Sequence, residues 1–150
     1  MSALITFDDS LWPLVIIRAQ GVPTDQETKE YHARSLSYLE RGEKYVTIAD
    51  LGQLGMLSPS QRRMQAEYLQ ENAAALHERL VGSATIIDST PLRLALYAIL
   101  PFKRMPMPFV VVADMDSAVR YALRRLEESG LGEAAARIRH QLEQRPPLLG

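Results

Sequence analysis

Three short runs decide the fold of this chain: VTIAD at residues 46–50, ATIID at 84–88 and VVVAD at 110–114. Each is rich in β-branched residues, which favour strands, and each is followed by a segment with helical spacing of apolar residues. Strands that alternate with helices are typical of a parallel sheet with crossover helices. Because each run ends in aspartate, acidic side chains are expected at the carboxyl ends of the strands, where open α/β sheets bind ligands.

The flanking segments extend this pattern to a single α/β domain. Residues 4–7 and 14–17 are predicted to form a hairpin, and the continuously apolar second run indicates a strand buried on both faces. The other predicted strands are 45–49, 84–87 and 109–112, and the predicted helices are 24–41, 58–81, 90–100, 116–128 and 133–143. We therefore expect one domain over residues 1–130, and a C-terminal helix with a frayed tail over 131–150.

The composition is that of an ordinary soluble protein, with 47% hydrophobic residues and a formal net charge of −1. Such a small net charge gives no reason to expect nucleic acid as a partner. The absence of cysteine excludes disulfides and thiolate metal sites, and it fits a cytoplasmic location. No apolar run approaches the ~20 residues of a membrane-spanning helix, and Asp8 and Asp9 interrupt the N-terminus too early for a signal peptide.

The strand-ending residues Asp50, Asp88 and Asp114 have two interpretations. If the strands are neighbours in chain order, the three carboxylates crowd one edge of the sheet, where they could hold Mg²⁺ for hydrolysis. Alternatively, each satisfies free backbone N–H groups where a strand turns toward a helix. No glycine-rich phosphate loop accompanies them, which favours the turn role. Asp50 keeps a functional role because it precedes an irregular connection with two glycines, residues 51–57.

Ser58 is the second candidate at this edge, because it precedes Pro59 at the start of a predicted helix and should cap it. A phosphate on Ser58 would lie at the helix N-terminus, which tolerates negative charge, so Ser58 is also a candidate regulatory site. Ser60 lies in the same helix start. The histidines show no metal-binding spacing and no serine lies in G-x-S-x-G, so no catalytic residue, metal site or cofactor is predicted.

The segment 91–108 is unusually apolar, and Arg93 is the only charge in its helical part. A sheet covers only one face of such a helix, so something else must cover the other. That cover is either another helix of the chain, such as the last one, or a partner, a second copy or a lipid. Leu96 is the candidate contact residue, and Lys103 and Arg104 at the border would suit an acidic partner or a lipid headgroup.

The order of elements resembles that of the STAS or SpoIIAA-like domains, the anti-sigma-factor-antagonist family, in particular its divergent bacterial branch related to SEC14-like domains. The resemblance covers residues 4–128, and its most specific part is FVVVADMDSA at 109–118, a last strand that runs into an acidic turn and an alanine-bearing helix. It implies a SpoIIAA-like singly wound (βα) superhelix, with a mostly parallel mixed sheet of about five strands and helices mainly on one side. It also implies no cofactor and no catalysis.

In that family the strand before the long helix ends in aspartate, and a loop leads to an Asp-Ser-Ser/Thr-Gly motif whose hydroxyl residue a partner kinase phosphorylates. Asp50 and Ser58 match these two positions. The sequence LSPS at 57–60 departs from the motif, because it lacks the preceding acid and the following glycine.

Two functions remain open at this point. The first is a non-enzymatic regulatory or protein–protein interaction module, which would bind a protein partner or a second copy through residues 50–60 and 91–108. The second is a small-molecule or lipid-binding domain of the SEC14-like kind, which an apolar pocket above ~300 Å³ beside the apolar helix would support. An Mg²⁺-dependent hydrolase that uses the three aspartates comes third.

Overall fold

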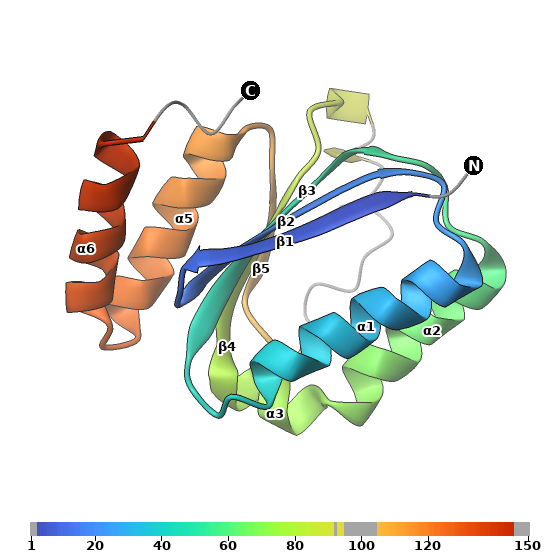
Figure 1. Ribbon diagram of the computed structural model, residues 1–150, viewed down its shortest axis with the longest axis horizontal. Coiled ribbons are helices and arrows are strands. Elements are labelled where there is room, and N and C mark those ends of the chain that lie inside the picture. The colour runs from blue at the N-terminus through green and yellow to red at the C-terminus, as the bar shows by residue number, and fades with distance from the viewer. Residues whose placement is uncertain (1–2, 92, 95–104, 146–150) are drawn as a thin grey trace.

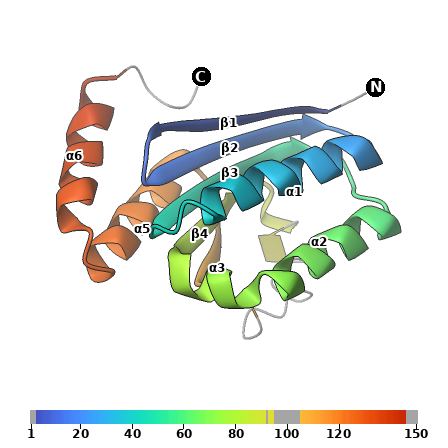
Figure 2. The same cartoon turned by 60° about the horizontal axis from the view of Figure 1, so that its bottom comes forward.

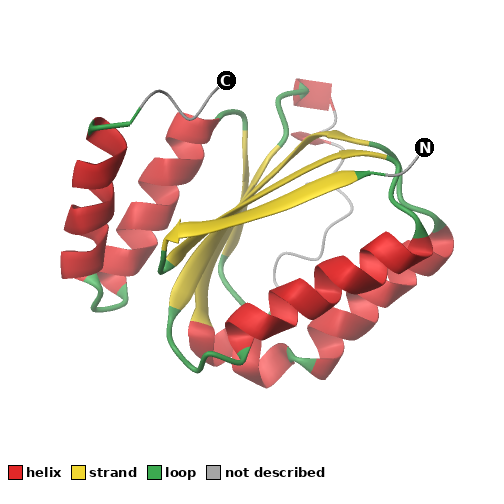
Figure 3. Ribbon diagram, viewed as in Figure 1, coloured by secondary structure: helices red, strands yellow, loops and turns green. Residues whose placement is uncertain are grey.

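The computed structural model describes residues 3–91, 93–94 and 105–145. A sheet of five strands in the order β1-β2-β3-β4-β5 runs through this part of the chain (Figure 3). The strands are β1 (Leu4–Leu11), β2 (Leu14–Gly21), β3 (Tyr45–Leu54), β4 (Leu80–Ile86) and β5 (Phe109–Val112). β1 and β2 form the predicted antiparallel hairpin, and every later pair of neighbours is parallel. The predicted mostly parallel mixed sheet is confirmed.

Helices cover both faces of the sheet (Figure 1, Figure 2). The described helices are α1 (Asp25–Leu39), α2 (Pro59–Glu71), α3 (Ala73–Arg79), α5 (Met115–Glu128) and α6 (Gly132–Glu143). Three of them, α1, α2 and α3, lie on one face, which we call the α1 face. The other two, α5 and α6, lie on the opposite face, which we call the α5 face. Among the described residues, no helix combines the length and the apolar character that crossing a membrane requires.

The continuously apolar strand β2 is buried on both faces, as its sequence predicts. Leu14 and Ile16 belong to the apolar cluster beneath α5, whereas Val15 and Ile17 belong to the cluster beneath α1. Successive side chains of a strand point to opposite faces, so a strand that lies between two helical layers needs apolar residues at every position.

The C-terminal helix α6 completes the core on the α5 face. Ala122 and Leu126 of α5 and Ala135 and Ile138 of α6 are all fully buried in the same cluster. The apolar stripe of α6 therefore packs on the domain beside α5 (Figure 1).

The predicted helix 58–81 differs from the structure in two ways. That helix is interrupted at Asn72, whose side-chain amide donates a hydrogen bond to the Tyr68 carbonyl over 2.9 Å. The chain then enters β4 at Leu80, earlier than predicted. Gly82 lies inside β4, where an added Cβ would lie 2.7 Å from Cγ of Arg125. The missing side chain thus allows α5 to pack closely against the sheet.

β3 is longer than predicted, and this changes the setting of Asp50. Residues 51–54 continue the strand and pair with the end of β2, where Gly21 lies opposite Leu54. Asp50 therefore lies within the strand, and the prediction that it ends the strand is wrong. The pairing with β2 explains the difference, because it satisfies the backbone of a segment whose glycines alone favour a loop.

Candidate functional site

The carboxyl ends of β2 and β3 meet the starts of α1 and α2 at one end of the sheet. We call this region the rim and define it as Val22, Asp50 and residues 55–60. The N–H of Gly55 donates a hydrogen bond to the Gly21 carbonyl over 2.8 Å. A Cβ added at Gly55 would lie only 2.7 Å from a methyl carbon of Val22. Glycine at position 55 therefore lets the two segments lie in contact.

Ser58 caps α2, as predicted, and does so as part of a reciprocal pair. Its Oγ accepts a hydrogen bond from the Gln61 N–H over 3.1 Å, and Gln61 Oε1 accepts one from the Ser58 N–H over 3.0 Å. Gln61 also donates from Nε2 to the Pro23 carbonyl over 2.8 Å and to Asp25 Oδ1 over 3.1 Å. Gln61 is only 4% exposed, so it fixes the start of α2 against the start of α1. The spacing Ser-x-x-Gln is the signal that points to it in the sequence.

Large apolar side chains are exposed at the rim. Met56 is 86% exposed and Val22 is 58% exposed. Ser58 beside them is half-buried, and Ser60 is exposed. An apolar surface of this kind with polar neighbours is typical of a contact site, because it is costly to leave in water.

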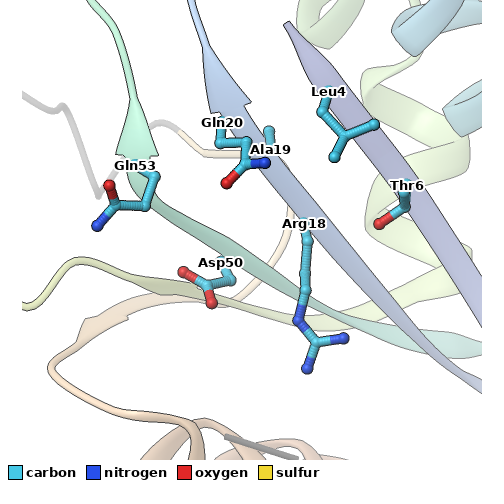
Figure 4. A pocket seen from close by; sticks show the side chains of 7 residues that line it. All are labelled: Leu4, Thr6, Arg18, Ala19, Gln20, Asp50 and Gln53. Atoms are coloured by element: carbon cyan, nitrogen blue, oxygen red, sulfur yellow. The ribbon is translucent and has the colours of Figure 1, made fainter. Parts of the chain in front are cut away.

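Asp50 lies at the same end of the sheet but on the α5 face. It follows Val46 and Ile48 in the alternation of β3, and both of these belong to the cluster beneath α5. It lines a shallow hollow of about 170 Å³ together with Arg18, its neighbour on β2 (Figure 4). Since α2 covers the opposite face, Asp50 and Ser58 lie on opposite sides of the rim.

Two of the three aspartates of the sequence pattern, Asp50 and Asp88, lie near each other beside Gly52, and Asp114 has a different role. A Cβ added at Gly52 would lie 3.7 Å from Oδ1 of both Asp50 and Asp88. Asp114 instead caps α5, where its carboxylate accepts the Ser117 N–H over 2.8 Å, and this hydrogen bond lowers the pKa of Asp114. Within the described residues no three His, Cys, Asp or Glu side chains are placed to hold a metal ion. The described residues therefore give the Mg²⁺ interpretation no support, and Asp114 has the role of satisfying a backbone N–H that the other interpretation expects.

Leu96, Lys103 and Arg104 lie outside the described residues. The described end of their segment packs inward: Met107 is 9% exposed and belongs to the apolar cluster of the α1 face, with Met105 packed against it. The Pro106 carbonyl lies 3.2 Å from Nδ1 of His77 on α3. Met105 and Met107 therefore contribute to the interior beneath the helices.

A cavity of about 620 Å³ lies between the α1 face of the sheet and the helices that cover it. Its floor is formed by alternate residues of the strands, among them Val15, Ile17, Ala49, Thr85 and Val111. Its roof is formed by residues of α1, α2 and α3, among them Tyr31, Ser35, Tyr38, Tyr68, Leu69 and Leu76.

Polar groups interrupt the apolar wall at a few places. Nε2 of His32 on α1 lies 2.6 Å from Oε1 of Gln65 on α2, and the His32 ring stacks on Tyr68 with centroids 5.0 Å apart. On the floor, the Thr47 hydroxyl donates to Ser83 Oγ over 2.9 Å. Burial raises the pKa of Tyr68 to about 12. No local sequence motif predicts the His32–Gln65 contact or the Thr47–Ser83 hydrogen bond, because the two residues of each pair lie far apart in the sequence.

Comparison with known proteins places the fold. No protein-family model and no curated protein matches the sequence. Among solved structures, an uncharacterised protein of the DUF3478 family from Shewanella loihica PV-4, described as having a SpoIIAA-like fold, matches with a TM-score of 0.63 and 15% identity. The match covers 81% of this chain and 94% of that one. The chain has the SpoIIAA-like fold.

Two further structures share the SpoIIAA-like fold with this chain. An anti-sigma factor antagonist from Mycobacterium paratuberculosis matches with a TM-score of 0.53 and 12% identity, over 81% of this chain and 94% of that one. A chain in the complex of the diguanylate cyclase SiaD with its activator SiaC from Pseudomonas aeruginosa matches with a TM-score of 0.52 and 16% identity, over 76% and 95%. The resemblance read from the sequence is confirmed for the fold.

Proposed function

We propose that this chain is a non-enzymatic regulatory module that binds a protein partner through the rim. The observation that carries the proposal is the exposure of Met56 and Val22, 86% and 58%, directly beside the Ser58 cap. Apolar side chains ringed by polar ones are typical of protein interfaces, in which an apolar centre excludes water and a polar border sets orientation.

The similar solved structures support this kind of function. One is an anti-sigma factor antagonist, and another contains an activator bound to the cyclase that it activates. Both descriptions concern regulation through contact with another protein. A partner that binds at the rim would use the same general mode of action.

Ser58 is the proposed switch at this surface. Its Oγ already accepts a hydrogen bond at the N-terminus of α2, where a phosphate would be stabilised by the helix dipole. The new charge would lie next to Met56 and would change what the rim can bind without unfolding the helix. The proposed site also includes Ser60 and, from the opposite side of the rim, Asp50. Leu96, Lys103 and Arg104 of the segment 91–108 are further proposed contact residues.

The test is affinity purification from the native host with wild-type chain, Met56→Glu and Ala136→Glu as separate baits. Ala136 is exposed on α6, on the opposite face of the sheet, so its substitution controls for added charge alone. We expect at least one protein to bind the wild type and Ala136→Glu but not Met56→Glu, and this protein is then titrated with the purified variants. An identical bound set for all three baits would show that the rim is not the docking surface.

A further inference from the structure

We propose that the cavity beneath α1 and α2 is a binding site for an uncharged, largely apolar small molecule. This inference goes beyond the docking function and does not depend on it, because it concerns the interior of the α1 face. The cavity of about 620 Å³ falls within the range of ~300–1,000 Å³ that ligand sites in proteins usually have.

The described wall has the composition of a site for an apolar ligand. Aromatic rings line it from three strands and two helices, namely Phe7, Tyr31, Tyr38, Tyr45, Tyr68 and Phe109. Between them lie aliphatic side chains such as Ile17 and Leu76. Such rings bury a large area against a ligand and lose little conformational entropy on binding, so they favour flat or extended hydrocarbon groups.

The polar groups of the wall favour a neutral ligand over an ion. The hydroxyls of Thr47 and Ser83 and the His32–Gln65 pair can each donate or accept a hydrogen bond, which suits one hydroxyl or carbonyl group on the ligand. Burial raises the pKa of Tyr68 because a low-polarity environment disfavours the charged form, and the same physical reason applies to a ligand in the cavity. A carboxylate or an ammonium group on the ligand would therefore weaken binding.

The cavity extends to the rim. Leu54, Met56 and Leu57 are among the residues that line it, as are Met105 and Met107. Methionine side chains are flexible and adapt to ligands of different shape. Met56 is largely exposed even though it borders the cavity, so the segment that precedes α2 provides a route between solvent and the interior.

The test uses three competitors that share one hydrocarbon chain and differ in charge. The full chain is titrated with N-phenyl-1-naphthylamine, an uncharged fluorophore, which is then displaced by decan-1-ol, decanoate or decylammonium. We expect saturable fluorescence, with decan-1-ol displacing the fluorophore at a concentration at least about tenfold lower than either ion, a ratio set by the cost of burying a charge. The absence of a saturable signal, or displacement by an ion as effective as that by decan-1-ol, would overturn the proposal.

Variants that fill the cavity locate the site. Ala49→Leu adds volume from the sheet and Ser35→Leu adds volume from α1, whereas Ala136→Leu adds the same side chain on exposed α6. We expect either cavity variant to weaken fluorophore binding by about tenfold or more, and the α6 variant to change it by less than about twofold. Circular dichroism verifies that each variant folds. If Ala49→Leu does not fold, Ser35→Leu alone tests whether the fluorophore binds in the cavity. Two folded cavity variants with wild-type binding would place the ligand elsewhere and overturn the proposal.

Discussion

At the residue scale, Ser58 combines a structural and a proposed regulatory role, and the two can be separated by substitution. Ser58→Ala removes the oxygen that accepts the Gln61 N–H, so it should lower the free energy of unfolding by about 1 kcal/mol. Ser58→Asp keeps an acceptor and adds a negative charge at the helix N-terminus, so its stability should stay close to that of wild type. Urea denaturation measures both values, and an equal loss in the two variants would contradict the role of the cap.

Gly55 determines how closely the two segments of the rim approach each other. Gly55→Ala would place a Cβ 2.7 Å from a methyl carbon of Val22 and 3.3 Å from the Gly21 carbonyl oxygen. We expect it to lower the free energy of unfolding by about 1–2 kcal/mol, the usual cost of a local clash.

Gly132→Ala is the matched control for Gly55→Ala. A Cβ at Gly132 meets no atom within 4 Å, and the residue opens helix α6. This change should be neutral or slightly stabilising, because alanine favours helix. Chemical denaturation of both variants compares the two sites, and a similar effect at each would argue against close packing at the rim.

At the element scale, α6 is the helix whose contribution to the stability of the domain is hardest to predict from the sequence. Ile138 is fully buried in the cluster that α5 also forms, so Ile138→Ala should lower the free energy of unfolding by about 2–5 kcal/mol. Glu143→Ala, an exposed change on the same helix, should stay within about 0.5 kcal/mol of wild type. If Ile138→Ala behaved like Glu143→Ala, α6 would be an appendage to a domain that ends near residue 130.

Tyr68, which lies where α2 contacts α1, should make the stability of the protein depend on pH in the alkaline range. Burial raises the pKa of Tyr68 from 10.0 to about 12 in the folded protein. The folded state therefore holds its proton more tightly than the unfolded state, so this contribution to stability is complete below pH 10 and is lost as the pH rises toward 12. Tyr68→Phe should show a shallower loss of stability across this interval when urea unfolding is measured at several pH values. Identical pH profiles for the two proteins would contradict the assignment.

At the scale of the whole molecule, the cavity and the rim share one segment, residues 55–57, and Leu54 beside it also lines the cavity. A ligand in the cavity would contact Leu54 and Leu57 from inside, while Met56 and Ser58 face the proposed partner from outside. We expect saturating N-phenyl-1-naphthylamine to slow amide hydrogen exchange in residues 54–61 and to leave α6 unchanged. Mass spectrometry of the exchanged peptides measures this, and protection confined to α6 would show that the ligand binds outside the cavity.

A ligand that protects residues 54–61 would also couple the cavity to the proposed docking surface. It would alter the conformational freedom of the rim and thus the affinity for a partner, by the reciprocity that applies to any two linked sites. The protection experiment tests this coupling without knowledge of the natural partner.

What the sequence determined by itself is the local structure and the order of the elements. The apolar strand 14–17 and the cap at Ser58 depend on neighbours only a few residues apart, and both are found where they were predicted. The β-branched runs also form strands, although β3 and β4 have other bounds than predicted, and Asp114 caps a helix as one of its two interpretations expects. The alternation of strands and helices then left few arrangements of the sheet, and the SpoIIAA-like fold is one of them.

Only the tertiary structure decided which side chains meet. Asp50 lies within β3 and does not end it, because β2 pairs with residues 51–54 and carries the strand past it. Gly82 lies within a strand because Arg125, far along the chain, packs against it. The cavity depends on the side-chain volumes of one helical layer and all five strands at once. Spacing along the chain predicts which face a residue occupies, but the space between the layers depends on long-range packing that no local pattern contains.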